Sequence, residues 1–137
     1  MTDRTGGCLC GKVRYALAGD PIATAVCHCK NCQRQSGSAF SLVVIARSSK
    51  LALEGELQTY LDTADSGAEL ERCFCPNCGS ALISRQPASP GMIVIKAGTF
   101  DDTTWLKPQL HIWCNSAQSW VVIPESLPRF PENAPGA

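Results

Sequence analysis

Cysteine is the residue type whose number and spacing could do chemistry in this chain. Seven of the nine cysteines fall into three short clusters, Cys8-Leu-Cys10, Cys27-His-Cys29-Lys-Asn-Cys32 and Cys75-Pro-Asn-Cys78. A structural zinc site is closed by four protein ligands, whereas a catalytic zinc site uses three and keeps one position open. Seven clustered thiols therefore suggest one closed zinc site and one open site.

The cluster from Cys75 to Gly79 is the most specific local signal. A Cys-x-x-Cys pair on a tight turn points two thiolates at one metal ion. Pro76 presets the backbone for such a turn, and Gly79 can adopt the positive φ that closes it. A redox pair uses the same spacing, but it usually opens a helix in a βαβ unit. The flanking segments here read as strands, which favours zinc.

The other two clusters could supply the remaining ligands. Cys8 and Cys10 would share one face of an extended strand, so one metal ion could reach both. Cys27 and Cys29 could do the same, with Cys32 returning on the next turn to complete a tripod. Spacing alone also allows Cys29 and Cys32 to join the Cys75 pair in one zinc ribbon, and it does not decide between the two pairings.

The tripod of Cys27, Cys29 and Cys32 has a chemical bias. Three thiolates donate strongly, so a metal ion held by them is a weak Lewis acid for activating water. Soft ligands favour one another on zinc, and a thiol binds there as its nucleophilic thiolate. The sequence therefore favours thiol substrates over ordinary hydrolysis.

Polar residues after the tripod are candidates for contact with the substrate or thiol cofactor, and they are Lys30, Arg34, Ser36 and Gly37. Lys30 and Arg34 are spaced i, i+4 on a short helix and could meet a substrate carboxylate. The alternative is a solvated helix face.

The two histidines have structural interpretations. On an extended segment His28 would point away from Cys27 and Cys29, which favours a polar role beside the site or on the surface over ligation. His111 lies in an apolar strand, where a hydrogen-bonded core histidine is the default and a pocket acid or base is the alternative. We expect buried apolar packing for Cys73 and Cys114. Core or pocket-wall roles are expected for Trp105, Trp113 and Trp120.

The chain reads as mostly β, with little helix. Alternating or continuous apolar runs predict strands at 12–17, 39–47, 51–53, 57–61, 69–74, 80–84, 92–97, 110–114 and 120–123. Residues 30–35 predict one or two helical turns. We expect residues 1–137 to form one small domain with its own core, and residues 131–137 to be a disordered tail.

Composition limits the class of protein. Lysine plus arginine and aspartate plus glutamate both number 12, so the chain has no basic excess to hold nucleic acid. The first residues contain no apolar signal segment, and no apolar run reaches the length of a membrane span. We therefore expect a cytoplasmic protein with reduced thiols and no membrane partner, in preference to a secreted disulfide scaffold.

The ordered clusters resemble a known family. Three segments, Gly7 to Tyr15, Cys27 to Gly37 and Phe74 to Gly79, are similar to the glutathione-dependent formaldehyde-activating enzyme family, which centromere protein V shares. The resemblance continues into Leu110-His-Ile112 and Ser116 to Trp120, and it covers about residues 5 to 130. The chain is shorter than the founding members, so loops that complete a glutathione pocket are expected to be trimmed.

The resemblance implies a mostly β, Mss4-like fold with two zinc ions. By the family pattern, Cys8, Cys10, Cys75 and Cys78 would hold a structural zinc, and Cys27, Cys29 and Cys32 would hold an open catalytic zinc. The implied activity is addition of glutathione to formaldehyde, or the reverse carbon–sulfur lyase reaction, with a small thiol and an aldehyde as partners. The alternative is a zinc-stabilised binding module without turnover.

Overall fold

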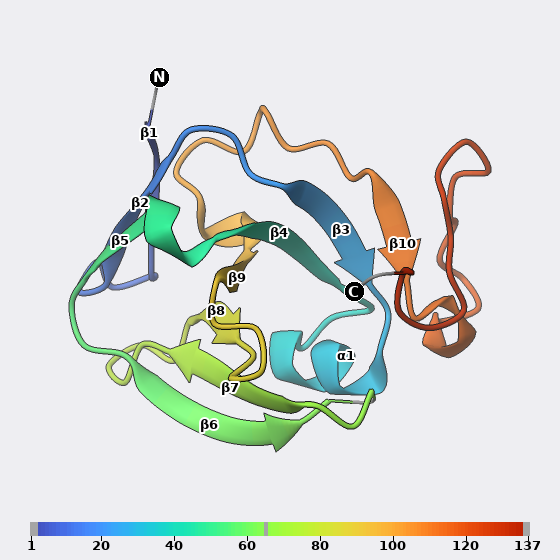
Figure 1. The fold of residues 1–137 in the computed structure, drawn as a ribbon, viewed down its shortest axis with the longest axis horizontal. Helices are drawn as coiled ribbons and strands as arrows, with labels where there is room; N and C mark the ends of the chain where they lie inside the picture. Colours follow the sequence, from blue (N-terminus) through green and yellow to red (C-terminus); the bar gives the residue numbers. More distant parts are fainter. Residues whose placement is uncertain (1–2, 65, 136–137) are drawn as a thin grey trace.

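The computed structural model describes residues 3–64 and 66–135, which form two β-sheets and one short α-helix. The smaller sheet is antiparallel and runs in the order β1 (Asp3–Gly7), β2 (Arg14–Ala18) and β5 (Leu51–Glu54). The larger sheet has the order β10 (Leu110–Ile112), β3 (Ala23–Cys27), β4 (Ser41–Arg47), β9 (Met92–Lys96), β8 (Ala81–Arg85), β7 (Glu69–Phe74) and β6 (Gln58–Thr63). Its strands pair antiparallel except for β10 and β3. Figure 1 shows the smaller sheet at one side of the larger one.

The larger sheet separates a core from a cavity. Successive residues of a strand point to opposite faces, so the register assigns each side chain to one face. Val44, Ile95 and Ile83 lie opposite one another on β4, β9 and β8, and all three are buried in the core with Tyr15 and Leu17 of the smaller sheet. Val43, Val94 and Ser84, each next to one of these residues, line the cavity on the other side.

Helix α1 (Lys30–Ser36) follows β3 directly and lies on that other side. Cys29 is its N-cap and accepts a hydrogen bond from the Cys32 backbone N–H at 3.2 Å. Gly37 ends the helix in the left-handed conformation, with φ of 65°, which glycine adopts without steric cost. The helix also contacts β6, because Asn31 Nδ2 donates to the Thr63 carbonyl at 3.1 Å. In Figure 1 α1 accordingly lies between the β3–β4 end of the sheet and the β6–β7 hairpin.

The structure confirms the prediction of a mostly β domain and corrects three of its elements. Residues 120–123 form no strand, and Trp120 and Val122 are exposed there. Strands β1 and β3 were not predicted. Strand β1 has the sequence Asp-Arg-Thr-Gly-Gly, which lacks the branched apolar residues typical of strands and is held by its pairing with β2.

The segment at the carboxyl end packs on β10. Phe130 N–H donates to the His111 carbonyl at 3.0 Å, and Trp113 N–H donates to the Glu132 carbonyl at 3.0 Å. Trp113 Nε1 also donates to Asn133 Oδ1 at 2.9 Å. The predicted disordered tail at 131–137 therefore makes hydrogen bonds as far as Asn133, and residues 136 and 137 lie outside the described residues.

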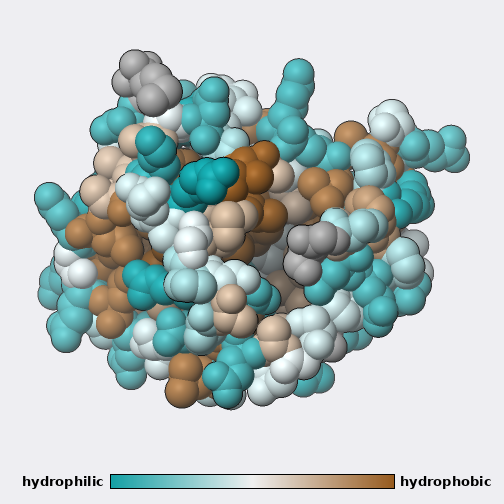
Figure 2. Space-filling model, viewed as in Figure 1, coloured by the Kyte–Doolittle hydropathy of each residue, from teal (hydrophilic) through white to brown (hydrophobic). Residues whose placement is uncertain are grey.

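The surface mixes polar and apolar residues. Figure 2 shows hydrophobic and hydrophilic side chains interleaved over one face, with a hollow near its centre. None of the helices in residues 3–64 and 66–135 has both the length and the apolar character needed to cross a membrane.

Candidate metal centres

Four cysteine sulfurs from two hairpin turns meet at one point. Cys8 and Cys10 lie in the turn between β1 and β2, and Cys75 and Cys78 lie in the turn between β7 and β8. The Cys8 and Cys10 sulfurs are 3.5 Å apart, and the Cys10 and Cys75 sulfurs are 3.7 Å apart. All four ligand atoms lie within 4.8 Å of one another. The cluster therefore joins the smaller sheet to the larger one.

The local backbone explains how these sulfurs converge. Cys8 and Cys10 were expected on an extended strand, but they lie on a turn in which Gly11 N–H donates to the Cys8 carbonyl at 3.2 Å. Gly11 and Gly79 take positive φ of 82° and 78°, so both turns use glycine to curl the chain. Val13 N–H lies 3.3 Å from the Cys8 sulfur and donates to it.

Ser80 is a site residue that the sequence analysis missed. Its hydroxyl lies 3.2 Å from the Cys78 sulfur and accepts a hydrogen bond from the Leu9 N–H at 3.1 Å. The Ser80 side chain and backbone are the main causes that lower the pKa of Cys78 to about 5. A serine next to a Cys-x-x-Cys turn gives no distinctive signal, because serine is common in turns.

The four-sulfur cluster fits a tetrahedral metal ion. Zinc binds thiolate sulfur at about 2.3 Å, which places the sulfurs of a regular tetrahedron about 3.8 Å apart. The separations of the Cys8 and Cys10 sulfurs and of the Cys10 and Cys75 sulfurs, 3.5 and 3.7 Å, agree with that value. The set is all sulfur, which is typical of structural zinc sites.

The second cluster contains Cys27, Cys29 and Cys32, whose sulfurs also lie within 4.8 Å of one another. Cys27 ends β3, Cys29 caps α1, and Cys32 lies in the first turn of α1. The strand-to-helix turn therefore forms the tripod. The zinc-ribbon pairing of Cys29 and Cys32 with the Cys75 pair is not what the structure contains.

The tripod borders a small cavity of about 150 Å³ on the helix side of the larger sheet. Its wall is mostly apolar and includes Val43, Val94 and Trp113. Arg72 and Lys96 line the same cavity, and both are buried, with 4% and 8% of their surface exposed. A fourth ligand for the tripod could enter from this space.

Each cation has one partner outside the tripod. Arg72 Nε donates to Asp62 Oδ2 at 2.8 Å, and Lys96 Nζ donates to Ser41 Oγ at 2.6 Å. Ser41 pairs directly with Cys27 across β3 and β4, so Lys96 lies beside the tripod. Hydrogen bonds with the Cys27 and Cys29 thiols lower the pKa of Cys32 to about 2, and the charges of Lys96 and Arg72 act in the same direction. Hydrogen bonds with the Cys29 and Cys32 thiols raise the pKa of Cys27, so the site favours negative charge on the Cys32 sulfur in particular.

The residues predicted to contact substrate lie elsewhere. Lys30, Arg34, Ser36 and Gly37 are all exposed. Ser36 Oγ donates to the Cys32 carbonyl at 2.7 Å, which fixes the end of α1. Arg34 and Gly37 border a separate open depression with Gln118. The structure brings none of these four residues to the wall of the tripod cavity, where it places Arg72 and Lys96 instead.

The two histidines form a buried pair behind the tripod. His28 Nε2 and His111 Nδ1 are 2.9 Å apart, and His28 is fully buried. Burial is the main cause that lowers the pKa of both imidazoles. The structure confirms His111 as a hydrogen-bonded core histidine. Of the two roles expected for His28, it shows the polar role beside the site and not the surface position. His28 packs against Phe40, and no partner for its Nδ1 is found in the described residues.

The other cysteines and the tryptophans divide between core and surface. Cys73 is fully buried, as expected, whereas Cys114 is only partly buried. Trp105 packs against the core and Trp113 lines the tripod cavity. Trp120 is exposed, so its expected core or pocket role was wrong.

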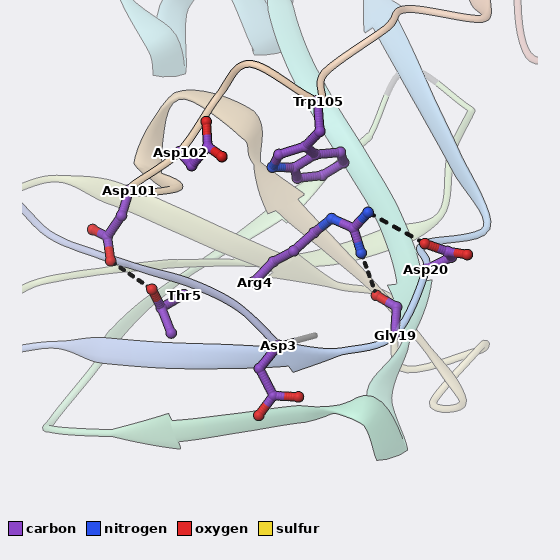
Figure 3. Close-up of a pocket in the computed structure, with 8 residues that line it drawn as sticks. All are labelled: Asp3, Arg4, Thr5, Gly19, Asp20, Asp101, Asp102 and Trp105. Atoms are coloured by element: carbon purple, nitrogen blue, oxygen red, sulfur yellow. Dashed lines mark hydrogen bonds and ion pairs between the residues drawn. The ribbon is translucent and has the colours of Figure 1, made fainter. Parts of the chain in front are cut away.

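A second, larger cavity of about 460 Å³ lies away from both cysteine clusters, between β1 and the segment after β9. Figure 3 shows Arg4 extending beneath the Trp105 ring, 4.5 Å from its centre, and bonded to the Gly19 carbonyl and to Asp20. The Arg4 guanidinium is therefore already paired with groups of its own cavity. The cavity therefore contributes no reactive group to the cysteine sites.

Comparison with protein families assigns the chain. Residues 3–116 match the family described as glutathione-dependent formaldehyde-activating enzyme. The chain belongs to this family. All seven clustered cysteines lie within the matched residues.

Relatives within the glutathione-dependent formaldehyde-activating enzyme family are similar at modest identity. A Talaromyces marneffei protein named for this activity is 25% identical over 123 residues, which cover 88% of this chain and 65% of the relative. A relative from Aspergillus flavus is 28% identical over 107 residues, covering 74% of this chain and 56% of the relative. One from Halomonas elongata is 26% identical over 124 residues, covering 86% and 79%. The chain thus spans less than two thirds of the length of the two fungal relatives.

A solved structure supports the fold. The crystal structure of a Rhodobacter sphaeroides protein is similar with a TM-score of 0.56 and 21% sequence identity, covering 76% of this chain and 91% of that protein. At this identity the likeness concerns the fold alone.

Proposed function

We propose that the chain binds two zinc ions and acts as a carbon–sulfur lyase or synthase on adducts of a small thiol and an aldehyde. Cys8, Cys10, Cys75 and Cys78 would hold the structural ion, and Cys27, Cys29 and Cys32 would hold the second. The observation that carries this proposal is the difference between the two clusters. The first is closed by four sulfurs, whereas the second has three sulfurs that border a cavity.

The reaction that best suits the tripod is addition of a thiol to an aldehyde. Zinc bound by the tripod would lower the pKa of an incoming thiol and so supply the nucleophilic thiolate at neutral pH. The thiolate sulfur forms a bond to the carbonyl carbon, the π electrons move to the oxygen, and that oxygen takes the proton that the thiol released. Breaking the same sulfur–carbon bond in reverse is the lyase reaction.

The chain's own residues would prepare the cavity for this step. The Cys29 cap and the first turn of α1 hold two sulfurs of the tripod in place. Arg72 and Lys96 favour negative charge in the cavity, and its apolar wall limits access of water. The family name points to glutathione as the thiol and formaldehyde as the aldehyde.

The test is the rate of adduct formation with zinc-loaded protein. Glutathione and formaldehyde combine without a catalyst, so exchange between free and adduct signals should be measured by NMR with and without protein. We expect acceleration by the wild type and by Cys114→Ser, whose thiol lies outside both clusters, and none by Cys32→Ser. Tight thiol binding without acceleration would instead identify a binding module. Neither effect at full zinc content, with glutathione or with a small thiol such as 2-mercaptoethanol in its place, would refute the proposal.

A further inference from the structure

Two buried cations line the tripod cavity. Arg72 and Lys96 are nearly buried, and burial of a cation is costly unless its donors are hydrogen-bonded. Both lie on strands of the larger sheet that face the cavity, on β7 and β9. The sheet therefore places two cations where a ligand of the tripod would lie.

The hydrogen bonds of these cations leave donors free. Arg72 uses its Nε–H on Asp62, and a guanidinium carries further N–H donors on its two terminal nitrogens. Lys96 uses one ammonium N–H on Ser41, and the ammonium carries others. Arg72 also interacts with the Cys32 sulfur, which helps raise the pKa of its guanidinium. Among the described residues, the Asp62 carboxylate is the only acid that forms an ion pair with either cation. Water can serve the remaining donors while the cavity is open.

A neutral ligand would displace that water without replacing its hydrogen bonds. Leaving a buried charged donor unpaired costs more than an ordinary lost contact, whereas a carboxylate offers two acceptor oxygens to a guanidinium and an ammonium. A site with such donors discriminates strongly against an analogue that lacks the acceptor.

The size of the cavity restricts the ligand further. At about 150 Å³ it is smaller than the roughly 300–1,000 Å³ of sites for drug-sized ligands. The carboxylates of a tripeptide thiol lie several bonds from its sulfur, so they would remain outside a space of this size.

We propose that Arg72 and Lys96 form a carboxylate subsite of the tripod cavity, and that the substrate is a small mercapto acid with its carboxylate one or two carbons from the sulfur. This inference rests on the proposed function, because the tripod is taken to hold the sulfur. It also narrows that function, since it makes a small carboxylated thiol a better ligand than a neutral thiol of similar size.

The test compares mercaptoacetate with 2-mercaptoethanol by calorimetric titration of zinc-loaded protein. Wild type should bind mercaptoacetate at least about tenfold more tightly than 2-mercaptoethanol. In Lys96→Met the ratio of the two affinities should fall to the value expected from the difference in basicity between the two free thiols. Comparing ratios between variants cancels the intrinsic difference between the thiols. Arg85→Gln removes an exposed cation at the end of β8 and should leave the ratio unchanged.

A second variant tests the same subsite independently, in case Lys96→Met does not fold. Asp62→Asn combined with Arg72→Gln removes the other cation together with its half-buried partner, so the Asp62 carboxylate is not left without its cation. Zinc content and circular dichroism should match wild type in each variant. The combined variant should also lose the preference for mercaptoacetate.

The same carboxylate could be carried by the aldehyde. A second arm therefore compares glyoxylate with formaldehyde in the rate of adduct formation with 2-mercaptoethanol. A preference in either arm that Lys96→Met removes supports the subsite and identifies the reactant that carries the carboxylate. Equal weakening of both thiols would mean that the cations only balance the thiolates, and would overturn the inference. If neither thiol binds, the proposed function fails as well.

Discussion

Ser80 is the residue that ties the two halves of the four-sulfur cluster together. Its hydroxyl contacts the Cys78 sulfur and accepts the Leu9 N–H, so one side chain contacts a ligand in one hairpin and the backbone between the two ligands of the other. Groups that orient metal ligands commonly change metal affinity by about 10–100-fold when removed.

We therefore expect Ser80→Ala to weaken zinc binding at this cluster about tenfold or more. The measurement is competition with a chromophoric chelator, made on chains in which Cys27, Cys29 and Cys32 are replaced by serine so that only this site binds zinc. Ser89→Ala, which removes an exposed hydroxyl from the next turn, is the matched control. Equal affinities in both variants would show that the hydroxyl only fills space.

Tyr15 carries a pH dependence that involves no metal ligand. Burial is the main cause that raises the pKa of Tyr15 to about 12, against about 10 for an exposed phenol. Because the folded state holds the proton more tightly, the contribution to stability is complete below about pH 10 and is lost as the pH rises to about 12.

A spectrophotometric titration of the folded protein should accordingly show a phenol that ionises near pH 12. Tyr15→Phe should remove that step. The idea fails if the wild type shows no ionisation step near pH 12, or if the step persists in Tyr15→Phe while circular dichroism still reports a folded chain.

At the scale of elements, strand β1 is held by close approach to its neighbours. A Cβ at Gly6 would overlap the Tyr15 hydroxyl and the Thr99 carbonyl, because the strand passes directly against both. Gly91 has no atom within 4 Å of the same position. The two glycines therefore differ in packing.

Gly6→Ala should lower the free energy of unfolding by about 2 kcal/mol or more, because the backbone at Thr99 must move. Gly91→Ala should change the free energy of unfolding by less than about 1 kcal/mol, and we expect a small increase because alanine restricts the unfolded chain. Urea denaturation of both variants checks this difference. Similar losses in the two variants would contradict the close packing of β1.

The elements also show what the sequence could and could not predict. The strands predicted at 69–74 and 92–97 agree with β7 and β9 within one residue. The first leads into the Cys75 turn, and the second contains a continuous apolar run from Met92 to Ile95. The sequence did not predict every strand in this way. Apolar periodicity missed β1, whose Gly6 is required by the neighbouring Tyr15 and gives no strand signal by itself. It also placed a strand at 120–123, where an apolar run has no strand to pair with in the described structure.

The candidate site was predictable only in part, because some of its residues are brought together by the tertiary fold and not by their spacing in sequence. The cysteines cluster in sequence, so their grouping was visible, although the family resemblance was needed to choose between two pairings. Arg72 and Lys96 are charged residues on strands, which sequence patterns assign to solvent. Their position in a cavity depends on sheet register and on the covering α1, neither of which a single strand reveals.

At the scale of the whole molecule, the two cysteine clusters have different places. The four-sulfur cluster joins hairpins of the two sheets, so it connects the halves of the core. The tripod lies at the end of β3 and the start of α1, on the cavity side of the larger sheet. The fold should therefore depend on the first cluster and survive the loss of the second.

Zinc per chain, measured by elemental analysis, tests this division most directly. We predict two zinc ions in the wild type and one in a variant with Cys27, Cys29 and Cys32 replaced by serine, with the circular dichroism of the fold retained. One zinc ion in both proteins after loading with excess zinc would contradict an open three-thiolate site. Collapse of the fold in the variant would contradict the separation of a structural centre from a reactive one.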